Sequence, residues 1–230
     1  MKIDIITLFP RMFEGPLDES ILKRAREHGL IQIEIHNLRN YAEGRHRITD
    51  DRPFGGGPGM LMKVEPIVRC VEALCSGESH VILLSPQGQR LEQSILQRLS
   101  RKKHLVLICG HYEGVDERVR QLVVNEEISI GDYVLTNGAL PAMVLVDGAA
   151  RLLPGVLGDK GSPHEESFSD SSWAGLEYPQ FTRPAEFRGL KAPDVLLSGN
   201  HKEIARWRRQ MSEDRTREQR PDLVKNRGEK

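Results

Sequence analysis

The chain has 230 residues, of which 38% are hydrophobic and 29% charged, and its 33 Lys and Arg balance its 33 Asp and Glu. This composition can bury a core, which argues against disorder, and no apolar run approaches the roughly 20 residues of a membrane span. Three cysteines without a Cys-x-x-Cys spacing exclude a disulfide scaffold and a zinc ribbon, so we expect a cytoplasmic protein in a reducing environment.

Strands that alternate with helices are predicted along the first 150 residues. The runs with strand character are Lys2–Phe9, Ile31–Asn37, His80–Leu84 and His104–Cys109. Apolar residues at helical spacing predict helices at 17–25, 66–74, 91–99, 117–122 and 139–153. This alternation predicts an α/β fold with a parallel sheet that is covered on both faces.

The character of the chain changes after Pro154. Residues 155–185 are rich in Gly, Ser, Pro and acids, whereas Ile204, Trp207 and Met211 predict an amphipathic helix further on. We therefore expect a cofactor-binding domain, a flexible linker or lid, and a C-terminal helical domain, at residues 1–158, 159–182 and 183–230. Residues 201–230 carry ten Lys and Arg against six acids, and this excess of positive charge could bind a polyanion. Charge alone favours the other interpretation, a helix whose charges pair with one another.

Three loops follow predicted strands or precede the last apolar helix of the α/β region. They are Ser85–Gly88, Gly110–Gly114 and Ile130–Gly138. Ligands of open α/β sheets bind outside the carboxyl ends of the strands, and glycines there allow close approach of the backbone. The shared position favours one pocket over three ordinary turns.

Common nucleotide-binding and zinc motifs are not found. The sequence has neither a P-loop nor a Gly-x-Gly-x-x-Gly turn after its first strand, and its eight histidines are scattered. The glycine-rich run 55–59 follows the charged stretch 45–52. That segment is either a flexible loop or one in which arginines meet phosphate and glycines let a base pass.

Eight sequence blocks, in order, resemble one family. They are ITLFP (6–10), RPFGGGPGM (52–60), LSPQG (84–88), CGHYEGVDERV (109–119), SIGDYVL (129–135), LPGVLG (153–158), YPQFTRP (178–184) and LLSGNH (196–201). They look like the bacterial tRNA (guanine-N1)-methyltransferases of the TrmD family. The resemblance implies methyl transfer from S-adenosylmethionine to N1 of guanine-37 in tRNA, beside the anticodon. It also implies a SPOUT-type fold with a deep trefoil knot, a homodimer with composite active sites and a need for Mg²⁺.

The resemblance also assigns roles to individual residues. Arg151 matches the arginine that supports the guanine, and Glu166 stands where the family has its general base, an aspartate. Asp170 is the alternative base, because glutamate is one methylene longer. Glu113 is expected to hold the donor's ammonium group, and no residue is assigned as a metal ligand. The expected donor-binding residues are Leu84, Ser85, Pro86, Gly110, Tyr112, Glu113, Ile130, Gly131, Asp132, Tyr133, Val134, Leu135 and Gly138.

These residue types suit alkylation at N1 of guanine. That nitrogen carries a proton, so a carboxylate is needed to remove it and a guanidinium can stabilise the charge that develops on O6. A metal is not required by this scheme. Two alternatives remain at this point: an RNA-binding protein of the same fold without catalysis, and a methyltransferase that acts on another RNA nucleoside, such as a ribose hydroxyl.

Overall fold

The computed structural model describes residues 1–157, 166–168 and 175–225. The chain divides into two compact units, Met1–Gly158 and Asp159–Lys230, and each is described by itself. Among the described residues, no helix combines the length and apolar character that crossing a membrane requires.

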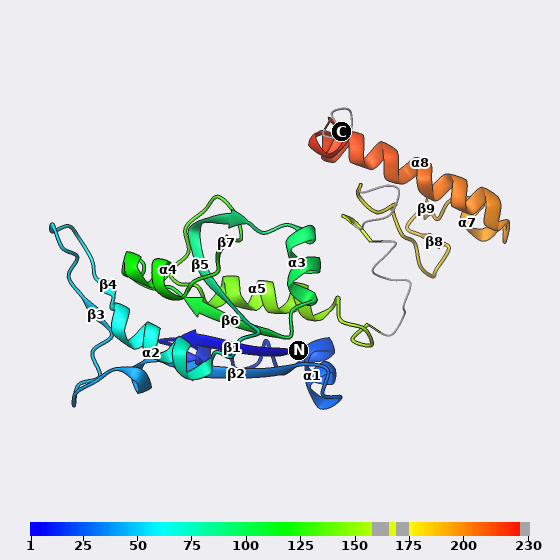
Figure 1. Ribbon diagram of the computed structural model, residues 1–230. Coiled ribbons are helices and arrows are strands. Elements are labelled where there is room, and N and C mark those ends of the chain that lie inside the picture. Colours follow the sequence, from blue (N-terminus) through cyan, green and yellow to red (C-terminus); the bar gives the residue numbers. More distant parts are fainter. Residues whose placement is uncertain (158–165, 169–174, 226–230) are drawn as a thin grey trace. The chain divides into compact units, whose positions relative to one another are not determined.

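The first unit is built on a five-stranded parallel sheet with the strand order β2-β1-β6-β5-β7 (Figure 1). Its central strand β6 is buried along its whole length, as its apolar sequence HLVLIC predicts. The parallel sheet expected from the alternating pattern is therefore present. The strands are β1 (Lys2–Thr7), β2 (Gln32–Asn37), β5 (Ser79–Arg90), β6 (His104–Cys109) and β7 (Glu126–Ser129).

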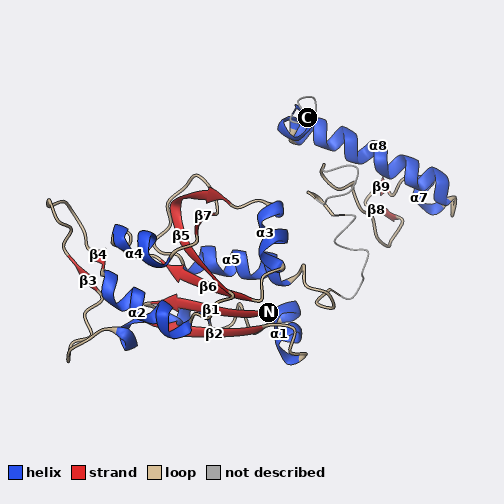
Figure 2. Ribbon diagram, viewed as in Figure 1, coloured by secondary structure: helices blue, strands red, loops and turns tan. Residues whose placement is uncertain are grey.

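Helices cover both faces of this sheet (Figure 2). Successive residues of a strand point to opposite faces, so Ile5 packs into one core and Ile6 into the other. The core that contains Ile5 is completed by α1 (Ser20–Glu27), α3 (Gln93–Ser100) and α5 (Ala139–Ala150). The core that contains Ile6 is completed by α2 (Val64–Leu74) and α4 (Glu117–Val123).

Strand β5 is longer than its apolar run predicts. It continues to Arg90, and Ile128 of β7 pairs with both Leu84 and Gln89. Ser85–Gly88 therefore form an irregularity between two stretches of regular pairing, where a loop was expected. A Cβ at Gly88 would overlap the backbone of β7, so glycine permits this close approach.

A long segment that we call the arm, residues 42–62, leaves the sheet between η2 (Leu38–Tyr41) and α2. It contains a short antiparallel pair, β3 (Asp50–Asp51) with β4 (Leu61–Met62), and Figure 1 shows it extending away from the sheet. Neither short strand was predicted. A 3-10 helix, η1 (Pro10–Phe13), follows β1.

The second unit contains a long helix, α8 (His201–Gln219), which the amphipathic pattern predicted. Its buried residues are Ser212 and Thr216, whereas the predicted apolar residues Ile204, Trp207 and Met211 are only half-buried. Trp207 lies beside the ring of Phe181, with ring centres 6.4 Å apart. The unit also holds β8 (Glu186–Phe187), β9 (Leu190–Lys191), α7 (Asp194–Leu197) and α9 (Pro221–Lys225).

Candidate functional site

A cavity of about 250 Å³ opens at the carboxyl end of β6 and beside the irregular stretch within β5, and all three predicted loops line it. Every expected donor-binding residue except Asp132 is part of its wall. Asp132 lies in the third loop, between the lining residues Gly131 and Tyr133, but is not itself in the wall. The parallel sheet thus brings together segments that are about 25 and 20 residues apart in sequence, as its topology requires.

The third loop rests directly on the second. The amide of Gly138 donates a hydrogen bond to the carbonyl of Gly110 at 2.8 Å, and the ring of His111 bonds the carbonyl of Thr136 at 3.0 Å. A Cβ added at Gly138 would stand 2.8 Å from the Cα of Cys109. Glycine is therefore needed here for the close approach of two backbones, which fixes the floor of the cavity.

The second loop holds a strained residue at its centre. Tyr112 has a φ of +58°, in the left-handed region that non-glycine residues seldom adopt. The arm supports this conformation: the amide of Glu113 donates to the carbonyl of Met60 at 3.0 Å, and the amide of Met62 donates to the carbonyl of Gly114 at 2.9 Å. Backbone strain that neighbouring structure maintains in this way is typical of binding sites.

Three charged residues in the wall were not predicted. Arg120 of α4 forms ion pairs with Glu127 at 3.0 Å and with Glu117 at 3.7 Å, and all three line the cavity. Glu127 belongs to β7, a short strand with two acids that has no apolar run to reveal it. Asn137 belongs to the predicted third loop but was not among the expected donor-binding residues, and its side chain accepts a hydrogen bond from the amide of Ala139 at the start of α5.

The two expected catalytic residues lie in different parts of the chain. Arg151 is the C-cap of α5 and its amide donates to the carbonyl of Asp147 at 3.1 Å. Pro141 of α5 lines the cavity, and Arg151 stands about 15 Å further along the same helix. Within one chain, the structure therefore does not bring Arg151 to the three loops that line the cavity.

Glu166 belongs to the second unit, where it is half-buried. The residues beside it are held locally: the amide of Glu177 donates to Oγ of Ser167 at 2.9 Å, and the amide of Phe168 donates to the carbonyl of Gly175 at 3.1 Å. The guanidinium of Arg220 stacks over the ring of Phe168. The alternative base, Asp170, lies outside the described residues.

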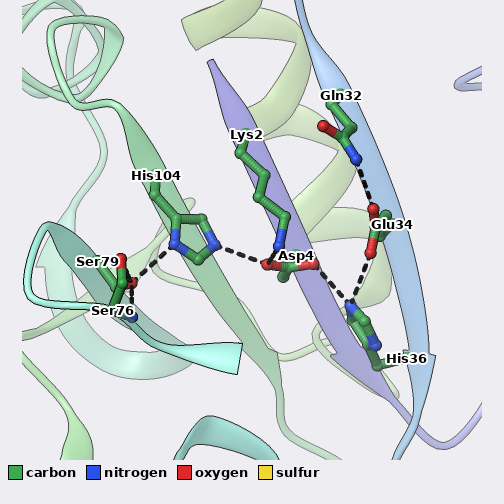
Figure 3. Close-up of polar contacts among 8 residues, drawn as sticks. All are labelled: Lys2, Asp4, Gln32, Glu34, His36, Ser76, Ser79 and His104. Atoms are coloured by element: carbon green, nitrogen blue, oxygen red, sulfur yellow. Dashed lines mark hydrogen bonds and ion pairs between the residues drawn. The ribbon is translucent and has the colours of Figure 1, made fainter. Parts of the chain in front are cut away.

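One described group could hold a metal ion, and it lies away from the cavity. Oxygen or nitrogen atoms of Asp4, Glu34 and His36 all lie within 4.8 Å of one another (Figure 3). Asp4 bonds His104, the first residue of β6, at 2.6 Å, whereas the cavity lies beyond Cys109, the last. This group is therefore at the opposite end of β6 from the cavity.

Asp4 is a fully buried carboxylate with three cationic or imidazole partners. Its oxygens accept hydrogen bonds from Lys2 at 2.9 Å, His36 at 2.7 Å and His104 at 2.6 Å (Figure 3). Burial raises the pKa of Asp4, but the bonds from His36, Lys2 and His104 lower it more, to about 2. The network joins β1 to both of its neighbours and explains why a charge is tolerated inside the sheet.

Comparison with known proteins identifies the family. The family model described as tRNA (Guanine-1)-methyltransferase TrmD matches residues 1–226. The tRNA (guanine-N(1)-)-methyltransferase of Carboxydothermus hydrogenoformans is 58% identical over 228 residues, which cover 99% of this chain and 89% of the relative. Those of Geotalea uraniireducens and Dictyoglomus turgidum are 58% and 56% identical, each covering 97% of this chain and 90% of the relative. The chain belongs to the tRNA (guanine-1)-methyltransferase family.

Proposed function

We propose that this protein is a tRNA (guanine-N1)-methyltransferase that uses S-adenosylmethionine to methylate N1 of guanine-37, beside the anticodon. The observation that carries the proposal is the cavity at the carboxyl end of β6, because it gathers the three loops that the family resemblance assigns to the methyl donor. Relatives that carry this activity in their names are up to 58% identical to the chain over nearly its whole length.

The cavity fits a donor of this kind. Its floor is backbone brought close by Gly138, its rim carries the carboxylate of Glu113, and its walls include Leu84, Pro86 and Ile130. The Glu113 carboxylate suits an ammonium group, and the apolar walls suit an adenine ring. When bound there, S-adenosylmethionine would supply an electrophilic methyl group on its sulfonium. The loops contribute alignment of that methyl with the acceptor nitrogen.

Glu166 and Arg151 would perform the remaining chemistry on the guanine. The carboxylate of Glu166 removes the N1 proton, which places negative charge on O6. The guanidinium of Arg151 stabilises that charge and never competes for the proton, because it stays protonated. This division of roles is the reason we prefer N1 methylation to ribose methylation, which needs no cation at a base edge.

A homodimer with composite active sites would bring these residues to the cavity. Arg151 lies about 15 Å along α5 from the cavity of its own chain, so a partner chain is the simplest source of the arginine. Helix α5 also presents an apolar stripe, with Leu140 52% and Val144 49% exposed. Phe9 and Met12 add exposed apolar surface in the same unit, and such patches are typical of interfaces between chains.

The trefoil knot of the SPOUT type is also proposed. Two observations support it: β5 pairs with both β6 and β7, and the segment after β7 returns to bond Gly110 and passes close to Cys109. A backbone that crosses between two earlier loops in this way is consistent with a knot that shapes the donor cavity. The division into a cofactor domain, a linker and a C-terminal helical domain remains part of the same proposal.

The C-terminal helical domain would bind the anticodon stem-loop of the tRNA. The arginines of α8 suit a phosphate backbone, although Arg206, Arg209 and Arg217 form ion pairs along the helix in this structure. Phosphate would have to replace Glu203 and Glu213 as their partner. In the free chain, α8 is therefore a salt-bridged helix. On RNA binding, its arginines would exchange their glutamate partners for phosphates.

Magnesium and location complete the proposal. The described residues that could hold a metal lie at the far end of β6 from the cavity, so no step of the reaction is assigned to one. A magnesium requirement would then act through the RNA. Because the substrate is tRNA and the three cysteines are unpaired, we propose a cytoplasmic location.

The test is methylation of a transcribed tRNA that carries guanine or adenine at the target position. The nucleosides are then identified by mass spectrometry. Formation of 1-methylguanosine from the guanine transcript alone is expected. A methylated ribose would favour a methyltransferase that acts on another RNA nucleoside. RNA binding without any methylated product would favour an RNA-binding protein without catalysis.

A further inference from the structure

The arm carries the most exposed large hydrophobic side chain of the described residues. Phe54 is 99% exposed, compared with 82% for Val134 and 79% for Leu190. It follows Arg52, whose side chain has no ion pair with any residue in the described part of the chain. Phe54 and Arg52 thus place a phenyl ring and a guanidinium in water, two positions apart, on a surface that no described residue covers.

The glycines that follow Phe54 shape this tip. Gly55, Gly56 and Gly57 all have positive φ values, of +84°, +82° and +123°, and none would meet a neighbouring atom if it carried a Cβ. Lack of space is therefore not the reason for glycine here. Glycine is needed because several successive residues have left-handed backbone angles, which any other residue adopts only at a cost in free energy. The sequence maintains a turn that holds the ring out in solvent.

The base of the arm is fastened to the donor cavity. Met60 and Met62 bond the amides of Glu113, Asp116 and His111 and the carbonyl of Gly114, at 2.9 to 3.2 Å. The second loop of the cavity and the arm are thus one hydrogen-bonded assembly. The base of the arm therefore lies beside the second loop of the cavity.

We infer that Phe54 is a stacking platform for an unpaired base of the RNA substrate, with Arg52 facing the adjacent phosphate. This rests on the proposed function. Unpaired bases stack on aromatic side chains in most sequence-tolerant RNA sites, and arginine supplies the complementary charge. The occupant is the single-stranded anticodon loop, because the arm is built on the loop that lines the methyl-transfer cavity.

The test compares Phe54→Ala, Phe54→Leu and Phe54→Trp in the full-length protein with an anticodon stem-loop RNA. We expect Phe54→Ala to weaken RNA binding roughly tenfold to a hundredfold, and Phe54→Trp to bind like the wild type with its fluorescence quenched by RNA. Phe54→Leu is the matched control, because it keeps apolar bulk and loses the ring. It should bind as weakly as Phe54→Ala, and S-adenosylmethionine binding should not change.

Three outcomes would overturn this inference. Wild-type RNA affinity in Phe54→Ala would show that the ring contacts no base, and full affinity in Phe54→Leu would show that bulk suffices without stacking. A change in the sedimentation of Phe54→Ala without a change in RNA affinity would place a second copy of the chain on the ring. Each is distinguishable from failure of the proposed function, which would show as a wild-type protein that forms no 1-methylguanosine.

Discussion

The side chain of Glu113 occupies the space where Gly59 would carry a Cβ. Any larger residue at position 59 would overlap the Glu113 carboxylate, so the glycine-rich run of the arm helps to place the proposed ammonium-binding group. Gly59 also has a φ of +80°, which adds a backbone requirement for glycine.

Gly59→Ala should therefore weaken S-adenosylmethionine binding about tenfold or more, because a displaced carboxylate loses its charge-assisted bond to the donor. Isothermal titration calorimetry measures this directly. Gly56→Ala is the matched control, since its φ of +82° imposes the same backbone strain and its Cβ would meet nothing within 4 Å. Equal affinity in the two variants would show that Glu113 can move without loss.

Glu166→Gln should lower kcat by about 10²–10⁴-fold and leave donor affinity within twofold of the wild type. The amide cannot accept the N1 proton, whereas the donor cavity belongs to other residues. Glu166→Asp is the control, because it restores the carboxylate that the family resemblance expects. Single-turnover methylation measures the rate. Full activity in Glu166→Gln would move the base role to Asp170 or another residue.

Arg151→Ala should reduce kcat to a similar extent, because it removes the charge that stabilises O6. If the arginine acts in the cavity of a partner chain, mixing Arg151→Ala with a Gly138→Val protein, whose donor cavity is blocked, should restore part of the activity. Each mixed dimer would then hold one intact composite site. No recovery in dimers shown to have exchanged chains would contradict a site shared between chains.

The sheet could be predicted where one residue pattern dominated a strand. His104–Cys109 matches β6 from end to end, because a central parallel strand buried on both faces is apolar throughout. Strand β7 could not be found in this way. Its first two residues, Glu126 and Glu127, are acids. They form ion pairs with Arg98 of helix α3 and Arg120 of helix α4.

The cavity could be predicted for a related reason. Its three loops follow from strand ends and glycines, which are local signals, whereas its charged wall depends on the pairing of β7. The proposed catalytic pair shows the limit of this reasoning. Nothing in the spacing of Arg151 and Glu166 reveals that one ends a helix about 15 Å from the cavity and the other belongs to a second compact unit.

The apolar pattern predicted helix α8 but not its two most deeply buried residues, Ser212 and Thr216. Two hydroxyls one turn apart bind the backbone of Leu176. Ser212 Oγ donates to the Leu176 carbonyl at 2.6 Å, and the Leu176 amide donates to Thr216 Oγ1 at 2.8 Å. A hydrophobic periodicity does not detect such a clamp, because serine and threonine count as polar.

Thr216→Val should destabilise this unit by about 1–2 kcal/mol, since valine keeps the shape and leaves the Leu176 amide without its acceptor. Hydrogen exchange at the Leu176 amide measures the effect and should accelerate about tenfold or more. Ser198→Ala is the control, because its hydroxyl bonds an exposed carbonyl at the end of α7. Unchanged exchange at Leu176 would show that the clamp is not maintained in solution.

Asp4→Asn should destabilise the first unit by about 3 kcal/mol at pH 7, because Lys2, His36 and His104 lose the charge that all three face in the sheet. Urea unfolding followed by circular dichroism measures this. Glu34→Gln is the matched control, since that carboxylate is 44% exposed and 4.0 Å from His36. Its effect should stay below about 1 kcal/mol.

The same carboxylate predicts a pH dependence with a definite sign. The pKa of Asp4 is about 2 in the folded protein and 3.8 as an ordinary carboxyl, so the folded state holds the proton less tightly. Its contribution of about 2 kcal/mol is then complete above pH 3.8 and is lost as the pH falls toward 2. The difference in unfolding free energy between wild type and Asp4→Asn should therefore shrink over that interval. Because other carboxylates titrate alike in both proteins, parallel curves from pH 5 to 2.5 would show that Asp4 is not the linked group.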